Sequence, residues 1–117
     1  MSELVQLVAL VTPNPGKVHQ LEKLQVAHCK WVEANEPGTL RFAFYKEILG
    51  DGEACATPKF VLHEIYKDRA ALDAHLSSVH MARVLQAVEK EQLWAEPIKT
   101  MYVKHAGGFL GREAPEP

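Results

Sequence analysis

The sequence has few cysteines, no long apolar run and no excess of basic residues. No apolar segment approaches the roughly 20 residues that a membrane-spanning helix needs, so we expect no membrane partner. Two cysteines in 117 residues are too few for a disulfide framework, and we expect Cys29 and Cys55 to be free. With 13 Lys and Arg against 15 Asp and Glu, the chain lacks the clustered positive charge that nucleic-acid binding requires.

The remaining composition is that of an ordinary globular domain. Hydrophobic residues make up 47% of the chain and charged residues 24%, and 117 residues suit one domain with its own core. The first residues, MSELVQL, lack the basic start and small-residue cleavage site of a secretory signal. We therefore expect a cytoplasmic protein whose partners are small molecules or a second copy of itself.

Apolar periodicity predicts four strands and two helices. Pro15 favours a helix start, and Pro37 with Gly38 ends that helix. A serine pair interrupts the second helix and supplies a fresh N-cap, so we expect two segments there. The predicted elements are a strand at 4–12, a helix at 16–34, strands at 39–46 and 60–66, helical segments at 69–76 and 78–92, and a strand at 98–104.

This order predicts an α+β, ferredoxin-like βαββαβ fold, with two helices on one face of a four-stranded antiparallel sheet. The strands are apolar on both faces, so the uncovered face also needs burial, and we expect a homodimer whose sheets meet. The domain is expected to span 1–105, with 106–117 a loosely ordered tail. The polar connection at 47–58 is long enough to shape a pocket rim.

The stretch from Lys59 to Met81 holds the densest set of ionisable groups on apolar frames. Period-two alternation places Glu64 on the same face as three apolar residues of its strand. A carboxylate there needs a partner, and we expect it to pair with His75, orient the imidazole and raise its basicity. Such a base can deprotonate a phenol or hydroquinone. The alternative is that the pair only joins strand to helix.

Other histidines are weaker candidates. His28 lies on the apolar face of the first helix, where it is either a core residue or a second candidate base. His80 follows His75 by five positions, roughly 140° round a regular helix, so we predict no metal site there. It is either a pocket residue or a cap near the helix interruption. His63 should face the opposite side of its strand, where a structural role is expected.

Aromatic side chains are available to line a flat apolar pocket for a substrate. The alternative for each of them is packing in the core. The candidates are Trp31, Phe42, Phe44, Tyr66 and Trp94.

The segment from Glu64 to Met81, E-x-Y-K-D-x-x-A-L-x-x-H-L-x-S-x-H-M, resembles the signature of the antibiotic biosynthesis monooxygenase (ABM) family. Residues 38–42 resemble the second strand of that family, and residues 97–104 resemble its last. The resemblance implies a dimeric α+β barrel with a pocket between each sheet and its own helices. It also implies a cofactor-independent monooxygenase that uses dioxygen on a phenolic, quinol or polyketide-type aromatic substrate. The alternatives are a non-catalytic ligand-binding or accessory domain, and an isomerase of a small phosphorylated sugar.

Haem-degrading relatives in the same superfamily use an Asn on the first strand, a Trp at the end of the third and an axial His on the second helix. Here the first strand has no Asn, Tyr66 stands in place of the Trp, and Leu85 takes the position of the axial His. We therefore expect neither haem nor another cofactor.

Overall fold

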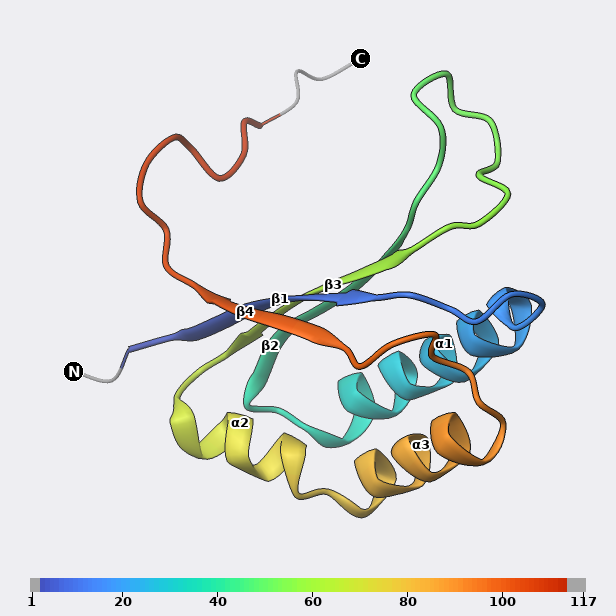
Figure 1. Ribbon diagram of the computed structural model, residues 1–117. Coiled ribbons are helices and arrows are strands. Elements are labelled where there is room, and N and C mark those ends of the chain that lie inside the picture. Colours follow the sequence, from blue (N-terminus) through green and yellow to red (C-terminus); the bar gives the residue numbers. More distant parts are fainter. Residues whose placement is uncertain (1–2, 114–117) are drawn as a thin grey trace.

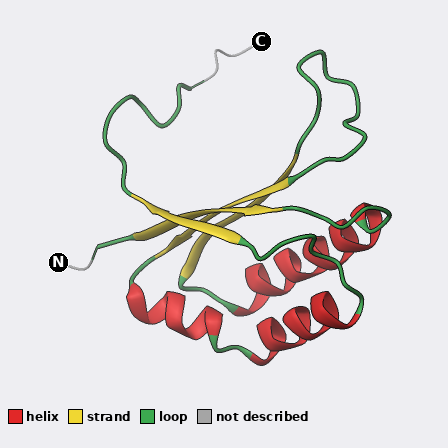
Figure 2. Ribbon diagram, viewed as in Figure 1, coloured by secondary structure: helices red, strands yellow, loops and turns green. Residues whose placement is uncertain are grey.

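The computed structural model describes residues 3–113, which form a four-stranded antiparallel sheet with three helices on one face (Figure 1 and Figure 2). The strand order is β2-β3-β1-β4, so the first and third strands lie in the centre. The predicted α+β, ferredoxin-like fold is therefore confirmed. The elements are β1 Val5–Val11, α1 Val18–Asn35, β2 Thr39–Lys46, β3 Phe60–Tyr66, α2 Arg69–Leu76, α3 Val79–Lys90 and β4 Lys99–Val103.

The two faces of the sheet differ in what covers them. On the face toward the helices, β3 places Phe60, Leu62, Glu64 and Tyr66, all of them buried. The predicted position of Glu64 on this face is confirmed, and His63 lies on the opposite face, with Nε2 3.3 Å from Gln6 Oε1. We call that side the open face. Its apolar residues are Val8, Leu10, Ala43, Tyr45, Val61, Ile65, Met101 and Val103, and its polar residues are Gln6, Arg41, His63 and Lys99.

The second helical region is divided into α2 and α3 by two side-chain caps. Asp68 accepts a hydrogen bond from the backbone N–H of Ala71 at 2.9 Å and begins α2. Ser78 accepts one from the backbone N–H of Met81 at 3.0 Å and begins α3. Each cap satisfies an amide that a helix start leaves without a partner. The predicted division at the serine pair is confirmed.

Two predicted helix ends are wrong by about two residues, and backbone conformation explains both. Gly16 has φ +81°, which lies outside the right-handed helical region, so α1 begins at Val18 rather than at 16. Gln92 has φ +51°, and α3 ends at Lys90 rather than at 92. The predicted helices were therefore correct in number of segments and in place, but too long at these ends.

Two segments extend from the sheet on the side away from the helices (Figure 1). One is the connection at 47–58, which continues the β2–β3 hairpin through an Ile48–Ala54 bridge. None of its residues lines the cavity described below, so the prediction that it shapes a pocket rim is wrong. The other follows β4 and has no helix or strand from residue 104 to 113. The rest of the expected tail, 114–117, lies outside the described residues.

Three observations bear on the expectations from composition. Both cysteines are free, as predicted. Between residues 3 and 113, no helix is long and apolar enough to cross a membrane. Over the same range, no group of three or more His, Cys, Asp or Glu is arranged to hold a metal ion.

Candidate active site between the sheet and the helices

A cavity of about 340 Å³ lies between the helix-covered face of the sheet and the helices. This volume is near the lower end of the range, about 300 to 1,000 Å³, that small-molecule sites occupy. Polar groups interrupt an otherwise largely apolar wall: besides the indole of Trp94, they belong to the inner residues Gln25, His28, Glu64 and His75 and to the exposed residues Thr100 and Tyr102. The apolar part of the wall includes Leu7, Ala9, Leu62, Leu72, Val84 and Ile98.

The cavity opens between β4 and the α2–α3 region. Its lining includes Leu76, Leu85 and Tyr102, which are 52%, 41% and 55% exposed, whereas Leu72 in the same wall is fully buried. Exposed lining residues mark the side from which a ligand can enter. A ligand that enters there meets leucine side chains and the hydroxyls of Thr100 and Tyr102 first, and the buried polar groups at the inner end.

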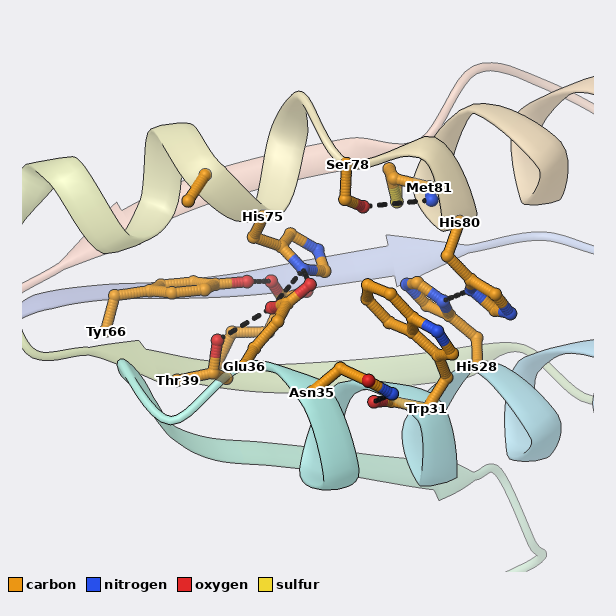
Figure 3. A network of polar contacts seen from close by, with 12 residues as sticks. His28, Trp31, Asn35, Glu36, Thr39, Tyr66, His75, Ser78, His80 and Met81 are labelled. Atoms are coloured by element: carbon orange, nitrogen blue, oxygen red, sulfur yellow. Dashed lines mark hydrogen bonds and ion pairs between the residues drawn. The ribbon is translucent and has the colours of Figure 1, made fainter.

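His75 is held by the carboxylate of Glu36, which lies just beyond the end of α1 (Figure 3). His75 Nδ1 lies 2.8 Å from Glu36 Oε1 and 3.1 Å from Oε2, and the two side chains are 3% and 11% exposed. The hydroxyl of Thr39 also donates to Glu36 Oε1 at 2.9 Å. Since a carboxylate accepts, Nδ1 carries the proton, and Nε2 of the neutral ring is left as an acceptor.

Glu36 reaches His75 because the turn after α1 packs closely against α2. Gly38 in this turn has no room for a side chain, since a Cβ there would lie 2.8 Å from the Cβ of Ala71. The backbone N–H of Lys67 donates to the carbonyl oxygen of Gly38 at 2.9 Å and fixes the approach. The turn thereby brings the carboxylate against an imidazole 39 positions later in the chain.

Glu64 lines the same cavity but has a different hydrogen-bond partner. The hydroxyl of Tyr66 donates to Glu64 Oε1 at 2.5 Å. Burial raises the pKa of Glu64; the Tyr66 hydrogen bond and His75 act against this rise, and Glu36 adds to it. Burial and the Glu64 carboxylate also raise the pKa of Tyr66, which therefore remains a donor. The predicted direct Glu64–His75 pair is thus wrong: the carboxylate that bonds His75 is Glu36.

His28 belongs to a second pair, in which its partner is an imidazole. His28 Nδ1 lies 2.9 Å from His80 Nδ1, so one of the two nitrogens donates and the other accepts. The rings of His28 and His80 are nearly parallel at 5.0 Å, and Trp31 stacks on His80 at 4.5 Å. Burial, and to a lesser extent His75 and His80, lower the pKa of His28 to about 4. His28 is therefore neutral at physiological pH.

The predicted site residues fall into two groups. His28, Phe42, Glu64, His75 and Trp94 line the cavity. The others lie outside its lining: His80 and Trp31 stack beside His28, Phe44 packs on Phe60, and Tyr66 bonds Glu64.

Two residues that are candidates for a functional role, Glu36 and Gln25, were not predicted from the sequence. Glu36 directly precedes the Pro37–Gly38 pair that ends the predicted first helix, and no signal in the sequence links it to His75. Gln25 lies three positions before His28, and this helical spacing was the one available sign that both face the cavity.

The fold and the cavity define a small α+β domain of the ferredoxin-like class with an apolar cavity between sheet and helices. The family model described as antibiotic biosynthesis monooxygenase matches residues 5–87, which is most of the chain. The chain belongs to the antibiotic biosynthesis monooxygenase family, and the resemblance noted in the sequence is confirmed. A comparison with curated proteins finds no match.

Solved structures share the fold over nearly the whole chain. A Pseudomonas aeruginosa protein is 23% identical, with 92% of this chain and 98% of the other covered and a TM-score of 0.74. A Mycobacterium tuberculosis protein is 24% identical, with 91% and 98% covered and a TM-score of 0.72. A Caulobacter crescentus protein that bears the family's name is 20% identical, with 91% and 92% covered and a TM-score of 0.73. At these identities the likeness shows the fold alone.

Proposed function

We propose that the protein is a cofactor-independent monooxygenase that oxidises a small phenolic or quinol substrate with dioxygen. The observation that carries this proposal is the Glu36–His75 pair in the wall of a buried apolar cavity. A carboxylate that accepts from Nδ1 leaves Nε2 as a base and stabilises the imidazolium that forms when the base takes a proton. The apolar wall, with Phe42 and Trp94, suits an aromatic ring.

The reaction begins with proton transfer from a phenolic oxygen to His75 Nε2. The resulting anion is electron-rich and passes one electron to dioxygen, which gives superoxide and a substrate radical. These combine in a C–O bond at a ring carbon that carries hydrogen, and the peroxide takes the proton back from His75. Loss of water then leaves a carbonyl, so one oxygen atom stays in the product and the substrate supplies all four electrons. A hydroquinone is thereby converted to a hydroxyquinone.

The cavity also narrows the choice of substrate. Its volume of about 340 Å³ favours a substrate of one or two fused rings over a larger, polyketide-type aromatic. No Lys or Arg is found among the described residues that line it, which disfavours a phosphorylated sugar. The remaining alternative is a non-catalytic ligand-binding domain. It would bind a ligand in the same cavity but would not oxidise it.

Oxygen uptake by the purified protein tests the proposal. We expect 1,4-benzenediol or 1,4-naphthalenediol to raise oxygen uptake above the buffer rate, with one dioxygen consumed per hydroxyquinone formed. His75→Gln should lose about 100- to 10,000-fold in rate, the usual contribution of a positioned base. His19→Gln, on an exposed part of α1, is the matched control and should keep the rate. Ligand binding without oxygen uptake would favour the non-catalytic alternative.

We further propose that the open face is covered by a second copy of the chain. Met101 and Tyr45 on this face are 62% and 54% exposed, and a largely apolar sheet face of this kind favours burial. The same patch on two copies can meet across a two-fold axis. The segments at 47–58 and 104–113 rise on this side of the sheet, where they would flank a partner (Figure 1).

Light scattering at micromolar concentration tests the assembly. We expect a dimer, and a monomer when Val8→Asp places a charge at the centre of the open face. Val26→Asp, on α1, is the control because that residue is exposed outside this face. A wild-type monomer would contradict the proposed dimer and leave the proposed chemistry untouched.

A further inference from the structure

Two buried nitrogen atoms in the cavity wall have no hydrogen-bond partner. They are Gln25 Nε2 and His28 Nε2, and no other buried side-chain nitrogen or oxygen within residues 3–113 is left unpaired. His28 is only 1% exposed. A buried polar group without a partner has lost its hydrogen bonds to water and gained none in return, so such atoms are rare without a functional reason. Their occurrence together, in residues that line one cavity, indicates a ligand that supplies the missing partner.

We propose that Gln25 and His28 form a binding subsite for one ligand oxygen, the oxygen that becomes anionic when the ligand loses its proton. The two residues are three positions apart on α1 and so lie on the same side of that helix. An amide nitrogen can only donate, and one oxygen can accept from two donors. Two donors directed at one oxygen bind its anion better than its neutral form.

The position of the subsite suits the base of the proposed function, on which this inference rests. The rings of His28 and His75 have centroids 5.6 Å apart, close enough for one small group to contact both. A phenol oxygen between them can donate its proton to His75 Nε2 and accept hydrogen bonds from the subsite. The subsite then stabilises the negative charge that proton transfer to His75 creates.

His80 acts as a positioning residue, because it decides which nitrogen of His28 carries the proton. Only one proton lies between the two Nδ1 atoms, which are 2.9 Å apart. We assign this proton to His80 Nδ1, since His28 then accepts at Nδ1 and the proton of its own neutral ring lies on Nε2. When His80 Nδ1 donates, His28 Nδ1 accepts and His28 Nε2 carries the N–H that the subsite needs.

Titration with 4-nitrophenol, whose coloured phenolate reports ionisation, tests the subsite. The affinities of the phenol and of the phenolate are measured separately from absorbance at several pH values. We expect the wild-type protein to prefer the phenolate. Gln25→Leu and His28→Phe should each bind phenolate about 10- to 100-fold more weakly, as expected for one lost hydrogen bond to a charged group, and bind phenol within about 3-fold of wild type.

Matched controls lie on the same helix. Gln20→Leu and His19→Phe change the same residue types at exposed positions and should leave both affinities unchanged. Gln25 is only partly buried, so Gln25→Leu tests the subsite even if His28→Phe fails to fold. No binding of 4-nitrophenol to the wild type, or an equal loss of phenol and phenolate affinity in Gln25→Leu, overturns the inference.

The role of His80 is tested by the nitrogen chemical shifts of the His28 ring, which distinguish its tautomers. The wild type should show the Nε2–H form. His80→Phe keeps a ring beside Trp31 but removes the donor, and should give a mixture. His80→Asn places an amide donor near the position of Nδ1 and should restore the Nε2–H form. An unchanged tautomer in His80→Phe contradicts the assignment.

Failure of the subsite and failure of the proposed function are distinguishable. His75→Gln should lose oxygen uptake but keep the preference for phenolate, since the two donors remain. A wild-type protein that prefers phenolate without any oxygen uptake would retain the subsite and lose the proposed oxygenase. Oxygen uptake by a wild-type protein that does not prefer phenolate would support the proposed oxygenase and contradict the subsite.

Discussion

The two histidines that line the cavity lie side by side but are held from opposite sides by different partners. His75, on α2, donates Nδ1–H to the carboxylate of Glu36. His28, on α1, shares a proton with the imidazole of His80, on α3. In both pairs the partner takes up Nδ1, so each ring is left with Nε2 for a ligand.

The difference between the partners separates the two rings chemically. A carboxylate favours the protonated form of the imidazole beside it, whereas burial and neighbouring imidazoles disfavour that form. The pKa of His28 is lowered to about 4 for the second set of reasons. In the proposed function His75 accepts the proton, whereas His28 remains neutral and forms hydrogen bonds. Partners outside the cavity lining, rather than the histidines themselves, assign these roles.

The largest expected effect comes from removing the carboxylate of the first pair. Glu36→Gln replaces an acceptor with an amide that can also donate to Nδ1, which places the ring proton on Nε2 and removes the base. We expect oxygen uptake to fall by about 100-fold or more, because a positioned base supplies about 100- to 10,000-fold. Steady-state rates with 1,4-benzenediol, compared with phenolate affinity, measure this loss.

The control is Glu33→Gln, an exposed carboxylate on the same helix. It should keep wild-type rates. If Glu36→Gln keeps them as well, the pair is only a structural link between α1 and α2, and the contrast between the two histidines loses its chemical meaning.

The second effect concerns stability and pH. The pKa of His28 is about 4 in the folded protein against an ordinary value of 6.5, so between these values the unfolded chain binds a proton that the folded protein does not. Stability must therefore fall as pH decreases from about 6.5 to about 4, by up to about 3 kcal/mol from this residue alone. In His28→Gln this part of the pH dependence should be absent.

Urea unfolding at pH 7 and pH 4.5 measures the difference between wild type and variant. Other carboxylates titrate at low pH in both proteins, so only the difference between them reports His28. His19 is exposed on the same helix, and His19→Gln should show the same change in the free energy of unfolding between the two pH values as the wild type. If the free energy of unfolding of His28→Gln changes with pH as it does in the wild type, then His28 is readily protonated in the folded protein. The two cavity histidines would then not differ in how readily they take up a proton.

Much of the frame around these pairs could be predicted from the sequence. Alternation with a period of two placed Glu64 toward the helices and His63 away from them, because strand geometry leaves only two faces. A cap was expected at the serine pair because a hydroxyl in the middle of a helical pattern offers an acceptor to the next turn, and Ser78 provides it. Such inferences use neighbours along the chain, where geometry is fixed by covalent bonds.

The partners of the histidines depend on contacts between distant segments, which no local pattern encodes. Glu36 and His75 are 39 positions apart, and they meet because Gly38 allows a turn to approach α2. His28 and His80 are 52 positions apart and meet only once α1 and α3 pack together. The sequence pointed to Glu64 as the carboxylate near His75 since both lie in one stretch, but the strand residue found a nearer donor in Tyr66.

The smallest expected effect comes from Glu64, the cavity carboxylate that bonds Tyr66 rather than His75. Its substitution tests whether His75 depends on Glu36 alone. The raised pKa of Glu64 means that the folded protein holds its proton to higher pH than the unfolded chain does, so the fold loses stability as pH rises through this range. Glu64→Gln removes the charge and keeps an oxygen that accepts from Tyr66. We expect it to stabilise the protein at pH 7 by about 1 kcal/mol, the scale of one exchanged buried polar contact, with no gain at pH 4.

Urea unfolding at the two pH values measures that gain, and oxygen uptake by the same variant completes the test. If Glu36 orients His75, the rate of oxygen uptake by Glu64→Gln should stay within a few-fold of the wild-type rate, whereas that of Glu36→Gln should fall by about 100-fold or more. Equal losses in both variants would mean that His75 depends on the charge of both carboxylates. A loss confined to Glu64→Gln would make the carboxylate without a hydrogen bond to His75 the working partner, and the Glu36 contact a structural one.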